Sequence, residues 1–460
     1  ESTPAWPSGA CQGILVEDVW MRDHYRQGMS VTSVQGLTVR HCWFTGTSGT
    51  LPESGVDIEP YLTYQPVQDI LFEHCLFTGN GHCGIQVSLW ELDAGSPPVD
   101  ITFRDCRTHD NGRPGHPYGP KEIDVHAGTS LVQGQVTFER VHVDGSDWSA
   151  VTVVKPAAAF ATAFTQCAFT DVSRAQVPFN APLWVETPSY SPPQPAFGGV
   201  AFSNCLVTYG SAYPFLWIYG FNGSQGVAEV SFQGTVENPG GGGVQITAAP
   251  DTIACSFNAV GLAALPATTV TWAMSQPVGQ ECGPMPITLE AVRQGLDLSF
   301  PLPTKYDADG DVSYGDDVHR LPGSLVIAAN VNDASLSIVP RADGIAEAPE
   351  EVVVTALSAP WYALSAPGAL AGTVYDCFGT AVQGSPGQAS YAIAPNPASA
   401  SFRMDGLDPQ MPLVLLDASG REVRTGTAGL VDVHGLPPGL YRVRMRDGGH
   451  EPAWSVVVIP

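Results

Sequence analysis

At 460 residues the chain is longer than a single compact core can serve, so two to four domains are expected. Hydrophobic residues make up 44% of it, together with 49 glycines and 40 prolines, a balance that favours turn-rich β structure over disorder. The excess of 45 acidic over 20 basic side chains excludes nucleic acid as a partner, because phosphate binding depends on clustered lysine and arginine. The sequence also has no apolar stretch long enough to span a membrane.

One sequence pattern recurs through the first half of the chain and predicts a parallel β-helix. Its copies each hold two short strands joined by a kink, and they cover residues 14–28, 37–49, 70–81, 101–112, 136–147, 163–173, 200–211 and 230–241. A further alternating strand follows most copies, at 55–60, 84–89, 121–126, 150–155, 182–186 and 243–247. Three strands in each period of roughly 23 to 38 residues predict rungs stacked about 4.8 Å apart, so that equivalent residues form ladders.

Five cysteines occupy equivalent places in these copies: Cys42, Cys75, Cys106, Cys167 and Cys205. This spacing predicts a buried ladder of thiols in the core instead of a disulfide framework. A β-sandwich would instead require hairpin turns every 8–12 residues or so, and this segment does not show them.

The copies and the phrase SGVDIEP at 54–60 resemble the right-handed β-helix repeats of the pectate-lyase-like superfamily. The resemblance covers about residues 11–250, and we assign 1–250 to this domain. It implies a right-handed parallel β-helix of the carbohydrate-processing kind. It does not imply one reaction, because this scaffold carries lyases, hydrolases, epimerases and adhesins.

Residues 251–282 show no clear period and are expected to be a linker or a small β extension. The segment 283–380 contains alternating strands with acidic residues between them and resembles a Calx-beta domain, a β-sandwich. The resemblance implies a calcium site, with candidate ligands Asp316, Asp317, Asp343 and Glu347. The alternative is that these acidic loops are simply solvated.

The last segment, 388–460, has turn residues that bound short alternating strands, which predicts a small β-sandwich. Its turns and anchors resemble the sorting domain read by the type IX secretion system: Pro395, Asn396, Pro397, Phe402, Asp417, Gly420, Arg421, Leu436, Gly439 and Tyr441. The resemblance implies export across the outer membrane, with the type IX machinery as a partner, and a secreted or cell-surface location. We therefore expect an all-β monomer: a right-handed parallel β-helix followed by two β-sandwich-like modules.

The candidate chemistry lies on the outward side of two β-helix strands. In 55–60, alternation points Val56 and Ile58 inward, so Asp57 and Glu59 point outward. In 121–126, the same rule predicts outward side chains for Glu122, Asp124 and His126. Two rung spacings would separate Asp57 from Asp124 by roughly 10 Å, near the separation that an inverting glycosidase needs.

These residues predict cleavage of glycosidic bonds in a polysaccharide, by a hydrolase or a lyase. The acid and base, or calcium ligands in a lyase, would come from four carboxylates: Asp57, Glu59, Glu122 and Asp124. Lys121 and His126 would assist proton transfer. Nearby aromatic and imidazole side chains would bind the substrate: Tyr64, His82, His109 and Tyr118.

Two alternatives stay open. A lyase would need a base, for which Lys121, Lys155 and His126 are available, and a cation such as Arg107 or Arg113 to neutralise the substrate carboxylate. A non-catalytic carbohydrate-binding surface protein or adhesin would need no proton transfer at all. An enzyme should show carboxylates converging with aromatics on one sheet, whereas an adhesin should show a flatter polar face.

Overall fold

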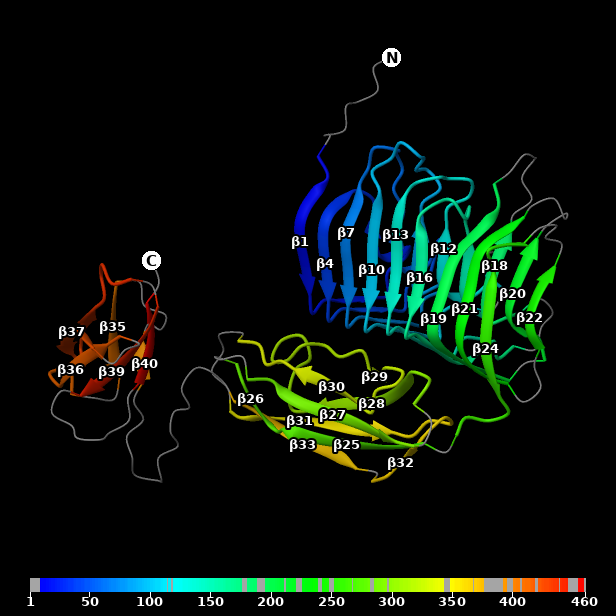
Figure 1. Ribbon diagram of the computed structural model, residues 1–460. Coiled ribbons are helices and arrows are strands. Elements are labelled where there is room, and N and C mark those ends of the chain that lie inside the picture. Colours follow the sequence, from blue (N-terminus) through cyan, green and yellow to red (C-terminus); the bar gives the residue numbers. More distant parts are fainter. Residues whose placement is uncertain are drawn as a thin grey trace, which may run out of the picture. The chain divides into compact units, whose positions relative to one another are not determined.

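The computed structural model describes residues 9–458 apart from 114, 117–118, 176–179, 188–194, 211, 221–225, 239–241, 248–251, 267, 282–284, 296–297, 343–347, 367, 376–391, 395–399, 406–407, 418–420, 438 and 446–453. Every regular element among these residues is a β-strand (Figure 1), which confirms the all-β prediction. The described part of the chain contains no long apolar helix of the kind that crosses a bilayer. The chain forms two compact units, one with most of the first 373 residues and one that is mainly C-terminal.

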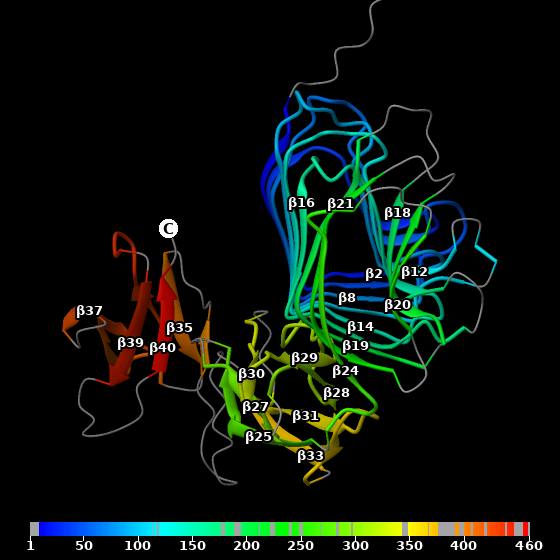
Figure 2. The ribbon, with the colours of Figure 1, turned by 45° about the vertical axis from the view of Figure 1, so that its right-hand side comes forward.

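The N-terminal part is a parallel β-helix, as predicted. One face consists of parallel neighbours β1 (Cys11–Glu17), β4 (Val34–Arg40), β7 (Val67–Glu73), β10 (Val99–Arg104), β13 (Gly134–Glu139) and β16 (Ala161–Thr165). A second face consists of β2 (Trp20–Arg22), β5 (Trp43–Thr45), β8 (Leu76–Thr78), β11 (Arg107–His109), β14 (His142–Asp144) and β17 (Ala168–Val172). The long strand β19 (Phe197–Tyr209) pairs with β16 of the first face and with β17 of the second. Figure 2 shows the β-helix from a second direction.

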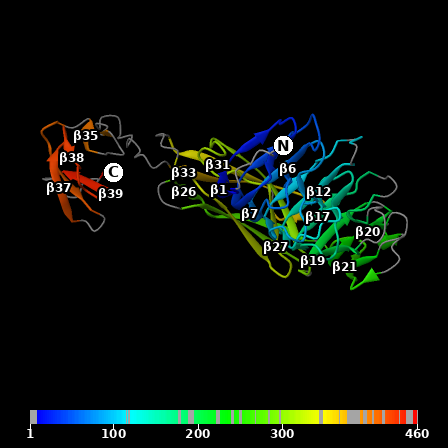
Figure 3. The ribbon, with the colours of Figure 1, turned by 90° about the horizontal axis from the view of Figure 1, so that it is seen from above.

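The third face is a separate eight-stranded sheet. Its parallel strands are β3 (Gln27–Val31), β6 (Ser54–Ile58), β9 (Ile85–Ser88), β12 (Lys121–His126), β15 (Ser149–Val154), β18 (Leu183–Thr187), β20 (Pro214–Gly220) and β22 (Gly242–Thr247). Strand β20 is a rung that the sequence pattern did not reveal. Figure 3 gives a view from above.

The β-helix core is built from ladders of stacked apolar side chains, some of which are identical from rung to rung. All five predicted ladder cysteines are buried, and a column of phenylalanines runs beside them. Phe103 stacks on Phe138 with ring centroids 5.2 Å apart, and Phe138 stacks on Phe164 at 4.4 Å. In-register pairing places equivalent residues above one another, so this ladder follows directly from the sequence repeat.

A left-handed backbone residue makes the kink in most rungs. Positive φ angles of 50–57° occur at Asp18, His41, His74, Asp105, Arg140, Gln166 and Asn204. Most of these are Asp, Asn or His, the non-glycine residues that adopt this conformation most readily. The kink turns the chain from the first face into the second and leaves these side chains outside the core.

The β-helix continues beyond residue 250. Strand β21 (Val227–Glu237) pairs in parallel with β23 (Thr252–Ile253) and β24 (Ser256–Leu262). The next strand, β25 (Thr269–Gln276), already pairs within the following domain. The segment 251–282 therefore contributes strands to both neighbouring domains.

A mainly antiparallel sandwich follows. One sheet contains β25, β27 (Ile287–Gln294), β30 (Asp333–Ile338) and β32 (Ala363–Leu364). The other contains β26 (Val278–Gln280), β28 (Leu302–Gly310), β29 (Ser324–Ile327), β31 (Glu350–Leu357) and β33 (Ala369–Tyr375).

Within the first unit, the sandwich packs against the kinks and the second face of the β-helix. Asp18 accepts hydrogen bonds from the backbone N–H of Arg320 and pairs with His319. The buried carboxylate of Asp144 pairs with Arg107, at 3.0 Å, and with Lys305 of the sandwich. Burial of Asp144 would raise its pKa, but neighbouring cationic groups hold the pKa well below its usual range. These contacts fix one face of the β-helix as an internal interface.

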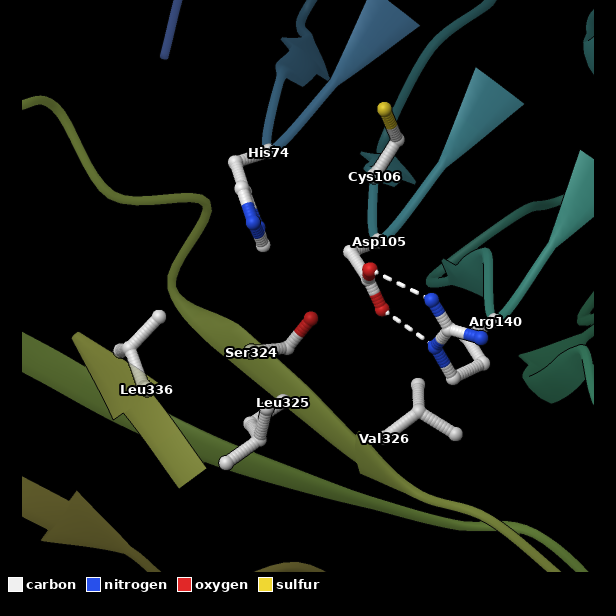
Figure 4. A pocket seen from close by; sticks show the side chains of 8 residues that line it. All are labelled: His74, Asp105, Cys106, Arg140, Ser324, Leu325, Val326 and Leu336. Carbon is white, nitrogen blue, oxygen red and sulfur yellow. Dashed lines mark hydrogen bonds and ion pairs between the residues drawn. The ribbon is translucent and has the colours of Figure 1, made fainter. Parts of the chain in front are cut away.

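Figure 4 shows a small cavity at this interface. Asp105 and Arg140 form a bidentate ion pair on the β-helix side, with N–O distances of 2.7 and 2.8 Å. Ser324 and Val326 of β29 face them. At about 10 Å³ the cavity has room for a single water molecule and no larger ligand.

The C-terminal module has a core of its own. Its sheets contain β34 (Ala392–Ala394), β35 (Ser401–Asp405) and β38 (Val431–Asp432), and β36 (Pro412–Leu416), β37 (Glu422–Thr427), β39 (Gly439–Met445) and β40 (Trp454–Val458). Phe402, Leu415 and Val443 are buried in that core, and Tyr441 lines it. Phe402 and Tyr441 are two of the predicted anchors, whereas Pro395, Asn396, Pro397 and Gly420 lie outside the described residues.

Candidate functional site

The outward side of the eight-stranded sheet carries one continuous row of functional side chains. Strand register aligns Ser30, Asp57, Gln86, Asp124, Thr152, Trp184, Trp217 and Gln245. We call this set the Asp57 row. A parallel row two residues further along each strand includes Ser88, His126, Val154, Glu186 and Tyr219. Alternation therefore brings Asp57 and Asp124 onto one face, two strands apart.

Asp57 is a buried carboxyl without a partner in the described structure. It has no exposed surface, and neither carboxylate oxygen accepts a hydrogen bond from any described group. Burial, reinforced by the charges of Glu59 and Asp124, raises the pKa of Asp57 to about 7, against the opposing effect of Arg26. Asp57 can therefore hold a proton near neutral pH.

Asp124 behaves in the opposite way. Burial would raise its pKa, but the electrostatic effects of Lys121 and, when they are protonated, of His82 and His126 outweigh burial and lower it. Lys121 Nζ lies 3.3 Å from Asp124 Oδ2, while the other oxygen, Oδ1, is buried without a described hydrogen-bond donor. Two carboxyl groups with pKa values shifted in opposite directions match the division between a general acid and a general base.

Two imidazoles near Asp124 are held neutral by burial. His82 stacks on His116 with ring centroids 4.4 Å apart, and burial lowers the pKa of His82 to about 3. The ring centroids of His126 and Trp90 lie 5.4 Å apart, with the two rings nearly perpendicular. Burial lowers the pKa of His126 as well, despite the nearby carboxylate of Asp124. Lys121 therefore provides the formal positive charge beside Asp124.

The prediction that Glu122 points outward is wrong. Its side chain is fully buried and accepts hydrogen bonds from Thr108 Oγ1 at 2.7 Å, the Asn111 backbone N–H at 2.9 Å and Asn111 Nδ2 at 2.6 Å. Burial raises the pKa of Glu122 to about 7, although these hydrogen bonds oppose the shift. In the neighbouring rung its place is taken by Gly84, where a Cβ atom would lie 2.3 Å from Thr108 Oγ1. Glu122 thus stabilises the turn at Asn111 through hydrogen bonds made inside the β-helix.

The predicted substrate-binding residues are divided between different parts of the molecule. His82 lies beside Lys121, whose backbone N–H donates to the His82 carbonyl oxygen at 3.3 Å, and it contributes to the lowered pKa of Asp124. His109 belongs to β11 in a different sheet, where it contacts Asp110 at 2.8 Å. Tyr64 is 57% exposed in the loop after β6, and Tyr118 lies outside the described residues.

Of the groups that a lyase would use, Lys121 and His126 lie beside the Asp57 row, whereas the two arginines and Lys155 do not. Arg107 is committed to Asp144 and the sandwich, and Arg113 pairs with Glu53 at 2.7 Å. Lys155 has no exposed surface; its ammonium donates to Pro156 O at 3.3 Å, and burial lowers its pKa to about 7.

The sequence reasoning missed an aromatic cluster on the same face. Trp184 and Trp217 belong to the Asp57 row, and Tyr219 belongs to the parallel row. The signal was present in the alternation of PLWVE at 182–186, which points Trp184 to the same side as Asp57. Strand β20 was not recognised as a rung, so the alignment of Trp217 with Trp184 could not be seen.

The predicted calcium ligands are only partly described. Asp316 Oδ2 accepts from Ser313 Oγ at 3.1 Å, and Asp317 is buried and accepts from the Ser313 backbone N–H. These two carboxylates lie in one turn, so they could supply some of the oxygen ligands of a calcium site. Asp343 and Glu347 lie outside the described residues.

Fold and site together define an all-β protein with a parallel β-helix, further β modules and an acidic, aromatic face on one sheet. No known protein family and no curated protein matches the chain in sequence. Among solved structures, the apo form of the Calx CBD1 domain is 20% identical, covering 24% of this chain and 97% of that chain with a TM-score of 0.20. CBD12 from CALX1.2 is 14% identical, covering 39% and 84% with a TM-score of 0.22. The calcium binding domain CBD12 of CALX1.1 is 15% identical, covering 38% and 78% with a TM-score of 0.21. Similarities this low define no activity for the chain.

Proposed function

We propose that the β-helix hydrolyses glycosidic bonds in an extracellular polysaccharide, with Asp57 as general acid and Asp124 as general base. One observation carries the proposal: two carboxyl groups in one outward row have pKa values shifted in opposite directions. Such a pair provides a protonated and an ionised carboxyl at the same pH.

In this mechanism, protonated Asp57 donates its proton to the glycosidic oxygen as the bond to the anomeric carbon breaks. Ionised Asp124 accepts a proton from the water molecule that attacks that carbon from the opposite side. Two strand spacings separate the two backbones by about 10 Å, and the inverting mechanism uses carboxyl groups about 6.5–9.5 Å apart. The side chains can reach that separation by leaning towards each other.

Neighbouring groups support these roles. Lys121 keeps Asp124 ionised, and the neutral imidazole of His126 can hydrogen-bond to sugar hydroxyl groups. Because Asp57 has no exposed surface, the side chains above it must move when a ligand binds. A substrate oxygen would then give this carboxyl its missing hydrogen-bond partner.

Hydrolysis is favoured over elimination by the positions of the cationic residues. A lyase must neutralise a uronate carboxylate. Arg107 and Arg113 are held in ion pairs elsewhere, and Lys121 is paired with Asp124. An activity screen tests the choice: hydrolysis releases reducing ends without the ultraviolet absorbance of unsaturated sugars, whereas a lyase yields both. Binding without cleavage would favour the adhesin alternative.

We propose that residues 388–460 direct export through the type IX machinery. Support comes from the resemblance of its turns and from its independent core around Phe402 and Tyr441. Deleting these residues should trap the protein in the periplasm of a host with that machinery, and cell fractionation with immunoblotting measures this. Deletion of the loop 60–65 provides a control that should not affect export. Normal appearance of the truncated protein outside the cell would contradict the proposal.

We also propose that the sandwich binds calcium, with Asp316 and Asp317 among the ligands. Binding to the folded state alone should raise the free energy of unfolding by about 2.7 kcal/mol at a hundredfold excess over Kd. Thermal unfolding of the full chain in calcium and in chelator measures the effect. Asp316→Asn should weaken it, whereas Asp333→Asn, an exposed substitution on β30, should not. Equal melting temperatures in calcium and chelator would exclude this site.

A further inference from the structure

The Asp57 row becomes aromatic two strands beyond Asp124. Trp184 on β18 and Trp217 on β20 are direct register partners, and their ring centroids lie 5.6 Å apart. Tyr219 completes the cluster, with its ring centroid 5.4 Å from that of Trp184. We call these three residues the aromatic platform. Trp217 is 5% exposed, and the other two rings are half-buried.

The aromatic platform is not part of the β-helix core. The residues that fill the interior from these two strands are Leu183, Val185, Leu216 and Ile218, which alternate with the platform residues. The large rings therefore stand on the outward side, where a polar surface would be expected. Apolar side chains gathered on an outward face often mark a binding site.

Hydrogen bonds hold the two indole rings in place. Trp184 Nε1 donates to Glu186 Oε2 at 3.2 Å, and Trp217 Nε1 donates to Thr247 Oγ1 at 3.0 Å. Both polar ring atoms are satisfied within the protein. Because Trp217 is almost fully buried, a ligand would meet the apolar surface of the half-buried Trp184 and Tyr219 rings, which pack against Trp217. A rigid, satisfied aromatic surface binds with little loss of conformational entropy.

The charge of the surrounding face determines which ligand suits it. Asp57, Asp124 and Glu186 belong to the two outward rows, and Glu59 follows the first of these strands. The described cations near these rows are Lys121, which is already paired with Asp124, and Arg26, which acts on Asp57, so acidic groups remain in excess. A polyuronate would bring further carboxylates to this acidic face, and like charges in close contact oppose binding. An uncharged sugar chain meets no such penalty.

We infer that the aromatic platform binds the apolar face of a sugar ring in a neutral polysaccharide, which runs across the strands from the platform to Asp124 and Asp57. The inference rests on the proposed function and extends it to a substrate class. Strand β18 lies two positions from β12 in the sheet, so about 10 Å separate the backbones of Trp184 and Asp124. One extended chain can therefore contact both.

Affinity electrophoresis of the full chain tests the inference, with hydroxyethylcellulose, galactomannan, arabinoxylan and polygalacturonate each cast in separate gels. At least one neutral polysaccharide should retard the protein, and polygalacturonate should not. Trp184→Ala should weaken association about tenfold, a typical loss for an aromatic residue at the centre of an interface. Trp184→Phe should recover much of it. Tyr375→Ala removes an exposed aromatic ring of the sandwich and should change nothing.

Retardation by polygalacturonate alone, by none of the neutral chains, or equally for wild type and a folded Trp184→Ala variant would overturn the inference. Circular dichroism establishes folding, and Trp184→Phe remains informative if the alanine variant does not fold. Asp57→Asn separates the two proposals, because it should abolish cleavage while neutral chains still retard the protein. If Asp57→Asn cleaves normally while Trp184→Ala fails to bind, the assignment of Asp57 as general acid is wrong, and the binding role of the aromatic platform is supported.

Discussion

Asp57→Asn and Asp124→Asn should each reduce the rate of polysaccharide cleavage by about 10²–10⁴, the range over which a general acid or base contributes. Asparagine keeps the shape of each side chain but cannot donate the acidic proton or accept one from water. Release of reducing ends from the neutral polysaccharide that the protein binds best measures the effect. Normal circular dichroism would show that the variants are folded.

Asp69→Asn is a matched control for these variants. Asp69 is an exposed aspartate on β7 with a positive φ angle, which asparagine tolerates well, and it lies on a different face. Its cleavage rate should equal that of the wild type. Full activity in both Asp57→Asn and Asp124→Asn would show that the site assignment is wrong.

The same roles predict how the rate depends on pH. Asp57 must be protonated, so cleavage should fall as pH rises through about 7, the pKa of its buried carboxyl. Asp124 must be ionised, and because its pKa is lowered, activity should persist down to pH values below the ordinary aspartate pKa of about 3.9. A pH–rate profile whose alkaline limb vanishes in Asp57→Asn would link that limb to Asp57.

Phe138→Ala should lower the free energy of unfolding by about 3–5 kcal/mol, the usual loss for a large aromatic ring removed from a core. Phe138 is fully buried and stacks on Phe103 and Phe164, so its loss opens a cavity between two rungs. Urea unfolding of the full chain, followed by circular dichroism, measures the change.

Thr137→Ala is the control for this substitution. Thr137 is half-buried on the outward side of the same strand, and its replacement should change the free energy of unfolding by less than about 0.5 kcal/mol. An equally small effect for Phe138→Ala would mean that neighbouring rungs collapse into the space or that another domain dominates the observed transition.

The sequence alone predicted most of the architecture of the first 250 residues, because a β-helix repeats its local pattern. In-register stacking converts equal spacing into ladders, so the positions of Cys75 and Cys106 already indicated a buried column. Alternation likewise predicted that Asp57 and Asp124 share one face. The strand at 214–220 was not predicted, because its consecutive apolar residues, PFLWIY, show no alternation of apolar and polar side chains.

The two-residue period of a strand could not predict the side-chain direction of Glu122 or the sheet to which His109 belongs, and both depend on tertiary structure. Glu122 lies at a corner, where the side-chain direction depends on the turn and on the hydrogen bonds offered by Thr108 and Asn111, so strict alternation misplaced it. His109 has the right chemistry but lies on another sheet, which follows from the path of the chain around the rung.

Three features were therefore determined by sequence: the all-β class, the ladders and the shared face of Asp57 and Asp124. Only the folded chain revealed the opposite pKa shifts of these two carboxyl groups, because they depend on burial and on the distance to Lys121. Only the folded chain aligned Trp184 with Trp217, since register between distant rungs is set by backbone pairing. Local periodicity specifies which side of a strand a residue occupies, but electrostatics and register arise from contacts between strands far apart in sequence.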